Sequence, residues 1–360
     1  EAGKYKITDT MAVLTDAEGR DHEVTMVQRW PVKQAIRSYV EKPRPDRIME
    51  TGVRAIDTFN PLAEGGTGFI PGPFGAGKTV LQHAISKQAD ADVIIIYRPS
   101  DNADDNQANL FARKVQEDLR AILQGPTTLE PKIELDMDLR PEGKNGPLVR
   151  SYASCEEYYR SWASTWEHQA LLRARYAAGD AALAEDFLMN VADPLRYPKI
   201  DLTEAQVAEI RKLKVRMEAE RLPRGVRRDR HLKLGKGGLS DVEWTIQLLQ
   251  LQHAGDNANL RVNGTMQALN ELERRKLVSA GDAVVLRRAW WMCTAARNGS
   301  YLWSGRVNQA DILPDDTYSL GGLAVYLGYD ANRGQHFEND LLAVMRKARD
   351  VTERLFYGLS

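Results

Sequence analysis

The stretch DADVIIIY, residues 90–97, decides the fold of the central part of the chain. It begins with two aspartates that lie two positions apart, and it continues as a run of apolar residues. Such a run is typical of a buried strand. Because side chains alternate along a strand, Asp90 and Asp92 are expected to share one face at its start.

A helix and a second strand follow this first strand. From residue 103 onward apolar residues recur at spacings of three and four, and Gly125 and Pro126 end the predicted helix. The stretch KIELDMDLR, residues 132–140, then alternates apolar and acidic side chains, which predicts a strand with Asp136 on its polar face. A strand, a helix and another strand form a crossover unit, which is most often parallel and right-handed.

If the two strands are neighbours, the carboxylates of Asp90, Asp92 and Asp136 converge. Such a cluster suits two divalent cations about 3.5–4 Å apart, the arrangement used for in-line displacement at phosphorus. Mg²⁺ prefers carboxylate oxygens combined with substrate phosphates. The alternative is that the acidic pair at the strand end consists of solvated turn residues.

Composition and charge limit the class of protein. The chain has 360 residues and a net charge of −1, so no global field attracts DNA or a membrane. Cys155 and Cys293 lie far apart in the sequence, which favours buried thiols in a reducing compartment. No apolar run approaches the roughly 18 residues of a spanning helix, and the N-terminus lacks a signal-peptide core. We therefore expect a cytoplasmic protein.

The pattern along the chain predicts an α+β protein with three parts. Residues 1–70 are expected to be β-rich, with strands on both sides of a turn at DAEGRD. Residues 71–150 form the predicted nucleotide-binding or nucleotidyltransferase core, with a mixed sheet and its crossover helix. Residues 151–360 form a predicted all-helical bundle. Capping boxes are predicted at three helix starts in the bundle: Ser154 with Glu157, Thr203 with Gln206, and Ser240 with Glu243.

A phosphate-binding loop precedes the first aspartate. GPFGAGKT, from Gly72 to Thr79, matches the G-x-x-x-x-G-K-[ST] pattern. In such a loop the backbone amides around Gly72, Gly75 and Gly77 hold phosphates, Lys78 reaches the β- and γ-phosphates, and the Thr79 hydroxyl binds Mg²⁺. The alternative is a chance match at a glycine-rich turn.

The surroundings of this loop, including IDTFNP and GPFGAGKTVLQH, resemble the catalytic A subunit of archaeal and vacuolar rotary ATPases over roughly residues 1–97. In that family the next strand leads to a glutamate that activates water. Here the strand is followed by Arg98, Pro99 and Ser100. A phosphate loop without a water-activating residue binds nucleotide but has weak means of hydrolysing it.

The rest of the chain, about residues 90–360, resembles the C-terminal, adenylylating half of glutamine synthetase adenylyltransferase. The stretches that carry the resemblance include ELDMDLRPEGKNGPLVRS, YYRSWASTWEHQALLRARYAAGD and HLKLGKGGLSDVEWTIQLLQLQHA. The resemblance implies ATP and glutamine synthetase as substrates, Mg²⁺ as cofactor, and a PII-type signalling protein as a partner. It also places the metal ligands at Asp90, Asp92 and Asp136. Asp138 stands where relatives carry arginine or asparagine, so it is expected to be a neighbour of the site. The family's glycine and serine segment before the two aspartates is missing.

Three other sets of residues have competing interpretations. Arg173 and Arg175 are candidates for phosphate contacts, and the alternative is that their helix fastens the bundle to the sheet. Asp241 and Glu243 resemble a metal pair, but the capping box explains Glu243. The segment 211–236 carries eleven Lys and Arg residues against three acids, which is typical of a solvated helix face rather than a nucleic-acid site.

The leading hypothesis is a Mg²⁺-dependent nucleotidyltransferase that transfers AMP from ATP to a tyrosine of glutamine synthetase. One alternative is a P-loop ATP-binding module derived from a rotary ATPase catalytic subunit. A further alternative is a non-catalytic protein that binds glutamine synthetase.

Overall fold

The structure is a computed structural model, and two compact units divide the chain at residue 46. It describes residues 6, 9–16, 19–25, 27, 48–49, 62–63, 91–100, 104–124, 135–223, 225–304, 310–330 and 332–359.

The first unit, residues 1–46, contains a two-stranded hairpin. Strand β1 (Thr10–Thr15) pairs antiparallel with β2 (Asp21–Thr25). Gly19 lies in the connecting turn with φ of 79°, a left-handed conformation that costs glycine little. The predicted strands around DAEGRD are therefore confirmed.

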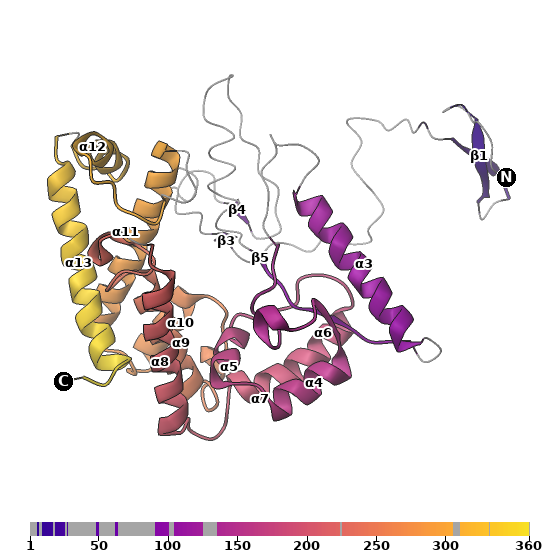
Figure 1. Ribbon diagram of the computed structural model, residues 1–360, viewed down its shortest axis with the longest axis horizontal. Helices are drawn as coiled ribbons and strands as arrows, with labels where there is room; N and C mark the ends of the chain where they lie inside the picture. Colours follow the sequence, from indigo (N-terminus) through magenta and orange to yellow (C-terminus); the bar gives the residue numbers. More distant parts are fainter. Residues whose placement is uncertain are drawn as a thin grey trace. The chain divides into compact units, whose positions relative to one another are not determined.

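Among its described residues, the second unit, residues 47–360, has three short strand pairs (Figure 1). Two of the pairs are parallel, as the predicted crossover requires. The pairs are β3 (Ile48–Met49) with β4 (Leu62–Ala63), antiparallel; β5 (Ala91–Asp92) with β7 (Leu135–Asp136), parallel; and β6 (Ile95–Tyr97) with β8 (Val149–Ser151), parallel.

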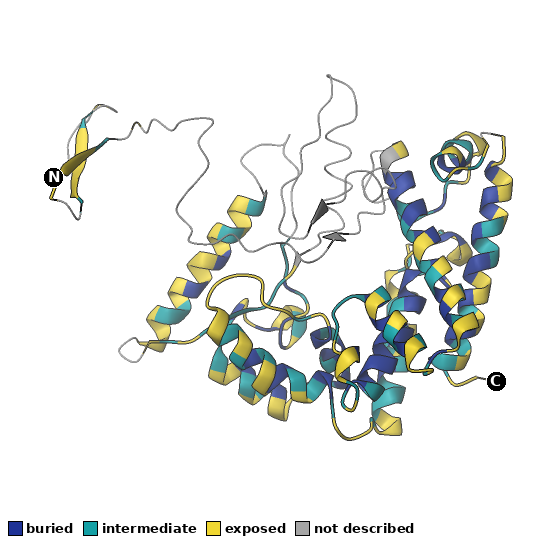
Figure 2. Cartoon of the chain, turned by 180° about the vertical axis from the view of Figure 1, so that it is seen from behind, coloured by how far each residue is buried: buried dark blue, intermediate teal, exposed yellow. Residues whose placement is uncertain are grey.

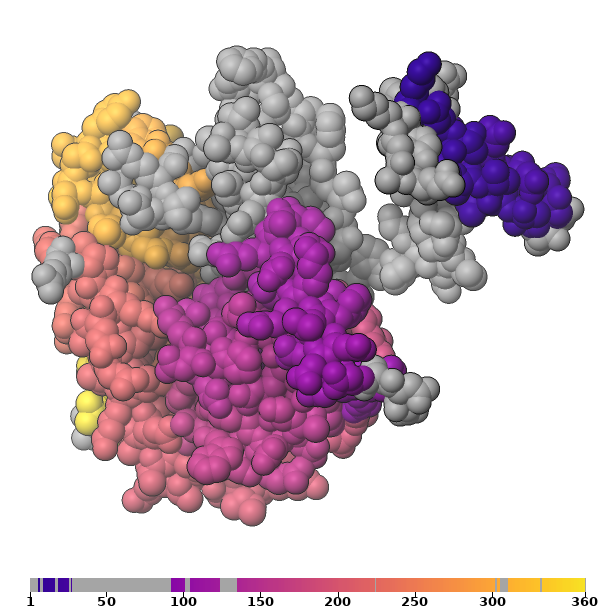
Figure 3. Space-filling view, turned by 45° about the vertical axis from the view of Figure 1, so that its right-hand side comes forward, coloured from indigo at the N-terminus to yellow at the C-terminus, as the bar shows by residue number. Residues whose placement is uncertain are grey.

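Helix α3 (Asp105–Gln124) is the crossover between β5 and β7. It ends just before Gly125, as predicted, and it packs against β6 and β8. Ala112 and Gln116 are buried, but Phe111 and Ile122 are 72% and 75% exposed. Figure 3 shows this helix, in purple, at the surface. Only some of the regularly spaced apolar residues of this helix therefore face the strands.

The second predicted strand is shorter than the alternation indicated. Within the described part of residues 132–140, the strand ends at Asp136 and a turn begins at Asp138. The amide of Arg140 donates to the carbonyl of Met137 at 3.2 Å, and this bond closes the turn. The expectation that Leu139 continues the strand is wrong, because a local turn outcompetes strand pairing here.

A small helical layer packs on the strands. It comprises α4 (Tyr152–Ser161), α5 (Thr165–Leu171), α6 (Ala181–Phe187), the π-helical turn η2 (Leu188–Ala192) and α7 (Asp193–Arg196). Its core contains Cys155, Tyr159 and Phe187, and Ile94 and Ile96 from the strand region pack against it. Burial of these side chains by the hydrophobic effect fixes the layer to β6.

The larger helical bundle follows, with most of its buried residues on α9, α11 and α13 (Figure 2). Its core includes Leu248, Leu286 and Leu341. The predicted all-helical character is confirmed for the described residues. The helices are α8 (Glu204–Arg221), α9 (Leu239–His253), α10 (Thr265–Arg274), α11 (Ala280–Ser304), α12 (Thr317–Tyr326) and α13 (Gly334–Leu355), with short 3₁₀ turns at Gly143–Asn145, Arg228–Arg230 and Ala258–Leu260.

One of the three predicted capping boxes is confirmed, and two are wrong. Thr203 and Gln206 exchange the expected bonds at the start of α8. Helix α4 begins one turn earlier than predicted, with Ser151 as its cap. Helix α9 begins at Leu239, because the amides of Leu239 and Ser240 donate to the carbonyls of Leu232 and Lys233 in the preceding loop.

The α+β class is confirmed, with helices in the majority. None of the described helices combines the length and the hydropathy needed to cross a bilayer.

The two cysteine thiols are expected to be inert in the folded protein. Cys155 and Cys293 are fully buried and unpaired, and burial raises the pKa of each thiol to about 12. The thiolate is the nucleophile, so neither side chain reacts at neutral pH. Titration with a thiol reagent should label no cysteine in the native protein and both after unfolding. Rapid labelling of native protein would contradict this burial.

The fold is expected to lose stability in mild acid, partly through His231. Burial lowers the pKa of this imidazole, and nearby Asp311 opposes the shift. Its Nδ1 accepts the amide proton of Leu234 at 3.0 Å, so the neutral ring is the folded form. As the pH falls below the ordinary value of 6.5, the unfolded chain binds the proton first. The stabilisation is therefore present above that value and lost below it.

Urea unfolding at about pH 7.5 and about pH 5.5 measures this effect. His231→Asn keeps an acceptor near the Nδ1 position and does not titrate. The variant should show a smaller drop in the urea midpoint than the wild type, and an equal drop would exclude His231 as the cause.

Candidate active site

Two of the three predicted carboxylates lie on neighbouring strands. Asp92 ends β5 and Asp136 ends β7, and the two are direct partners in the parallel register. Partners in neighbouring strands point to the same face of the sheet, and such strands lie about 4.8 Å apart. Asp92 is exposed and Asp136 is half-buried. The crossover thus brings together two side chains that are 44 positions apart in the sequence (136 − 92).

Backbone bonds orient the Asp136 carboxylate. Its Oδ1 accepts the amide proton of Asp138 at 2.7 Å, and its own carbonyl accepts the amide proton of Val93 at 2.8 Å. The first bond fixes the carboxylate and the second extends the pairing of the two strands. Among the described residues, this pattern leaves one lone-pair direction of Oδ1 and the whole of Oδ2 for other ligands.

The donor set of Asp92 and Asp136 fits Mg²⁺. Both supply hard carboxylate oxygens from one face, next to solvent. Within the described residues, no group of three or more His, Cys, Asp or Glu side chains is gathered closely enough to hold a metal ion. Asp90, the third predicted ligand, lies outside the described residues.

Asp138 has a different environment from the two strand carboxylates. Its side chain is 42% exposed and pairs with Lys144, whose Nζ lies 3.2 Å from Oδ2. Because the turn carries it out of the strand, its contribution to the site is the amide that holds Asp136. This agrees with the expectation that Asp138 is a neighbour.

The predicted phosphate loop lies outside the described residues. This applies to Gly72, Gly75, Gly77, Lys78 and Thr79 alike. Their role in binding nucleotide stays a prediction.

Arg173 makes its bonds inside the protein. Its guanidinium donates to Glu243 at 2.5 Å, to the carbonyl of Asn263 at 3.0 Å and to Thr265 at 2.5 Å. These contacts tie the end of α5 to α9 and α10, as expected for a helix that fastens the bundle. They also explain Glu243, which pairs with Arg173 and does not cap a helix. Arg175 is exposed, and its contact with phosphates stays a prediction.

The residues that organise the site's surroundings were not found from the sequence. Arg140 is 7% exposed and donates to three backbone carbonyls in the loop after β7. Glu167 on α5 accepts from Tyr158 at 2.9 Å and caps its own helix through Ser164. A signal for Arg140 existed in the pattern LRPEGKNG, because a loop so rich in turn residues needs donors for its carbonyls.

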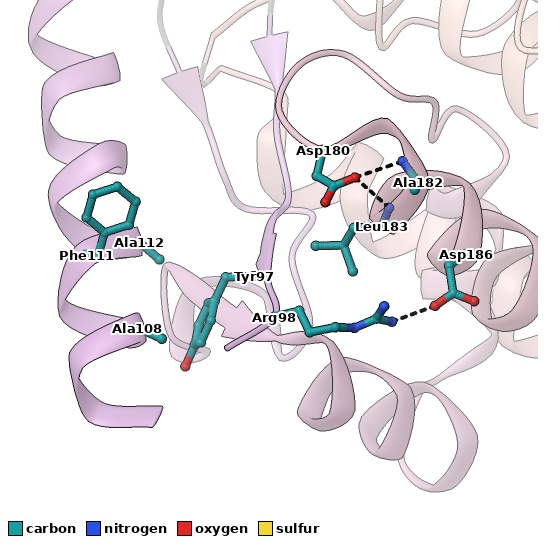
Figure 4. Close-up of a pocket in the computed structure, with 9 residues that line it drawn as sticks. All are labelled: Tyr97, Arg98, Ala108, Phe111, Ala112, Asp180, Ala182, Leu183 and Asp186. Carbon is teal, nitrogen blue, oxygen red and sulfur yellow. Dashed lines mark hydrogen bonds and ion pairs between the residues drawn. The ribbon is translucent and has the colours of Figure 1, made fainter. Parts of the chain in front are cut away.

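A pocket of about 500 Å³ lies beside Tyr97 and Arg98, where β6 ends (Figure 4). Arg98 spans its edge, donating to Asp186 at 2.5 Å and lying over the ring of Tyr152 at 4.4 Å. This bond lowers the pKa of Asp186. The lining residues are Tyr97, Arg98, Ala108, Phe111, Ala112, Asp180, Ala182, Leu183 and Asp186. None of them belongs to the predicted carboxylate site.

Comparison with protein families matches three segments of the chain. Residues 84–190 match the family model of glutamate-ammonia ligase adenylyltransferase. Residues 208–356 match the model described as GlnD PII-uridylyltransferase. Residues 1–33 match the barrel-sandwich domain of the ATP synthase alpha/beta subunit. The family of the central match is described as an adenylyltransferase, which is a kind of nucleotidyltransferase.

Individual relatives agree with the central match. A bifunctional glutamine synthetase adenylyltransferase/adenylyl-removing enzyme from Bifidobacterium longum (strain DJO10A) is 80% identical over 274 residues, which are 76% of this chain and 26% of the relative. The enzyme of the same name from Streptomyces avermitilis is 44% identical over 270 residues, or 75% of this chain and 27% of the relative. That from Mycolicibacterium smegmatis is 43% identical over 270 residues, again 75% and 27%.

The chain therefore spans about a quarter of the length of these curated relatives. The resemblance to glutamine synthetase adenylyltransferase is confirmed over three quarters of the chain. The resemblance to rotary ATPases is supported only over residues 1–33 of the predicted 1–97.

Proposed function

We propose that this chain carries a nucleotidyltransferase that moves AMP from ATP to a tyrosine hydroxyl of glutamine synthetase and releases pyrophosphate. The observation that carries the proposal is the register pairing of Asp92 with Asp136 on adjacent parallel strands. The names of the relatives that share three quarters of the chain support the substrates.

In this proposal Asp92 and Asp136, together with Asp90, hold Mg²⁺. The chemistry that the ion supplies at such a site is neutralisation of the triphosphate and polarisation of its phosphorus–oxygen bonds. The Asp138 amide holds Oδ1 of Asp136, and Oδ2 is available to a further ligand. It helps to take the proton of the tyrosine hydroxyl. The tyrosine oxygen then bonds to the α-phosphorus, while the bond from that phosphorus to the bridging oxygen breaks and pyrophosphate leaves.

The proposal also assigns a role to each of the three segments of the chain. Residues 71–150 form the nucleotidyltransferase core, with its mixed sheet and crossover helix, and residues 151–360 form a bundle that holds the protein substrate. The match of residues 208–356 to a PII-uridylyltransferase model supports contact of this bundle with a PII-type signalling protein. Residues 1–70 are proposed as a β-rich N-terminal segment. Glutamine synthetase as substrate places the reaction in the cytoplasm.

Calorimetric titration with ATP and Mg²⁺ tests whether the aspartates, rather than the glycine loop, carry the nucleotide. The matched variants are Asp92→Asn and Lys78→Ala, each of which removes one charge from one of the two candidate sites. The proposal expects Asp92→Asn to weaken Mg²⁺-dependent binding at least about tenfold. Binding that is abolished by Lys78→Ala and unchanged by Asp92→Asn would contradict it and favour the P-loop module.

A further inference from the structure

Arg140 is a buried cation whose hydrogen bonds all go to backbone. Its Nε donates to the carbonyl of Gly146 at 2.9 Å, Nη1 to that of Met137 at 2.7 Å and Nη2 to that of Lys144 at 3.0 Å. The nearest carboxylate oxygen in an ion pair with it, on Asp138, lies 4.0 Å away. The guanidinium therefore serves to hold a loop, and its planar fork suits three carbonyls that converge from different directions.

The loop that Arg140 holds is tightly folded, and it needs hydrogen-bond donors in its interior. Glu142 has a left-handed backbone with φ of 65°, which is uncommon for a residue with a side chain. A Cβ at Gly146 would lie 2.0 Å from the carbonyl oxygen of Pro141, so the chain passes itself very closely there. The carbonyls turned inward by this folding need donors, and Arg140 supplies three of them.

The same loop sets the direction of the Asp136 carboxylate. Met137, whose carbonyl Arg140 binds, joins Asp136 to Asp138. The amide of Asp138 in turn donates to Oδ1 of Asp136 at 2.7 Å. The peptide between Met137 and Asp138 thus carries both bonds, with its carbonyl bound by Arg140 and its N–H bound to the carboxylate.

We infer that Arg140 is a positioning residue for Asp136: it fixes the Met137–Asp138 peptide, and that peptide aims the carboxylate at the bound metal and nucleotide. The inference rests on the proposed function, in which Asp136 is a metal ligand. Without Arg140 the loop backbone rotates, and the amide of Asp138 no longer holds Oδ1. The direct consequence is weaker metal binding, with slower transfer following from it.

The test compares Arg140→Lys with Arg196→Lys. Arg196 is a matched control, because it is also 7% exposed and also donates to backbone carbonyls, those of Leu171 and Ala174. Lysine keeps the charge in both variants but replaces the planar fork. The readouts are Mn²⁺ affinity by electron paramagnetic resonance with a non-hydrolysable ATP analogue, and the Mg²⁺ concentration for half-maximal AMP transfer.

Arg140→Lys should weaken Mn²⁺ binding and raise the Mg²⁺ requirement by about ten- to a hundredfold, as for other residues that orient metal ligands. Arg196→Lys should leave both unchanged while lowering the unfolding temperature. If both variants lose stability alike and neither changes the metal dependence, Arg140 is structural and the inference is wrong. Should Arg140→Lys not fold, Arg140→Gln, which keeps a donor for Met137, takes its place with the same readouts.

The two proposals fail in different ways. If the wild type transfers no AMP, the proposed function fails, and the Mn²⁺ affinities alone decide whether Arg140 positions a metal ligand. If the wild type is active and Arg140→Lys has wild-type Mn²⁺ affinity, only the positioning role fails.

Discussion

Replacing Asp136 with asparagine is expected to lower the rate of AMP transfer by between about a hundredfold and about ten-thousandfold. Under the proposed mechanism, the substitution removes the negative charge that would hold the metal and the basic oxygen that would accept the tyrosine proton. An amide oxygen can still accept the N–H of Asp138, so the local fold is expected to persist. Initial rates with ATP and glutamine synthetase, alongside a circular dichroism spectrum, measure both effects.

Asp138→Asn is the matched control for this substitution. It removes a carboxylate two positions away, which pairs with Lys144 and is 42% exposed. The backbone amide that holds Asp136 is retained, so the rate should change by no more than a few-fold. Equal losses of transfer rate in the two variants would mean that Asp136 acts only through local charge. A fully active Asp136→Asn would show that Asp136 is not part of the active site.

The second large effect concerns stability. Lys214 on α8 is fully buried and contacts Asp241 and Glu218, and Asp241 is itself only 1% exposed. Asp241 also binds Arg349 on α13 at 3.2 Å and accepts the amide proton of Gly237 at 2.6 Å. Burial alone lowers the pKa of the Lys214 ammonium, but the two acids more than offset this and raise it. The Lys214 ammonium therefore stays charged, and its cluster joins helices α8, α9 and α13.

Lys214→Met is expected to lower the free energy of unfolding by about 3–5 kcal/mol, because it leaves the buried Asp241 with less than its full set of partners. Methionine has a similar length, so lost packing contributes little. Urea denaturation followed by circular dichroism measures the change.

Lys114→Met provides the comparison for Lys214→Met. Lys114 pairs with Asp118 at 2.8 Å on the exposed side of α3, where both side chains are more than half exposed. Exposed pairs of this kind contribute little, so no measurable change in unfolding is expected. If Lys214→Met were as mild as this control, the buried cluster would not hold the bundle together.

The same cluster shows what the sequence alone could not reveal. Asp241 and Glu243 follow a serine at helix spacing, so local rules predicted a capping box. The helix begins earlier, at Leu239, and the two carboxylates pair instead with distant residues, Lys214 and Arg173. Partners 27 and 70 positions away leave no local pattern. By contrast, the capping box at Thr203 depends only on neighbours within one turn, and it was predicted correctly.

In the candidate site, too, local patterns could be predicted from the sequence and longer-range contacts could not. The alternation and the helix between the strands indicated a crossover in which Asp92 and Asp136 converge if the strands are neighbours, and the structure pairs those strands. The length of the second strand was not predictable in this way, because Arg140 and the turn it closes decide where the strand ends. Side-chain bonds to backbone carbonyls compete with strand pairing, and the periodicity of a sequence does not show them.

The most direct measurement of the central claim is transfer of label from α-³²P-ATP to glutamine synthetase by the wild-type chain in the presence of Mg²⁺. The account predicts label on a tyrosine of glutamine synthetase, with release of pyrophosphate and loss of transfer in Asp136→Asn. Tight binding of ATP without any transfer of label would contradict it and leave a protein that binds nucleotide but does not adenylylate.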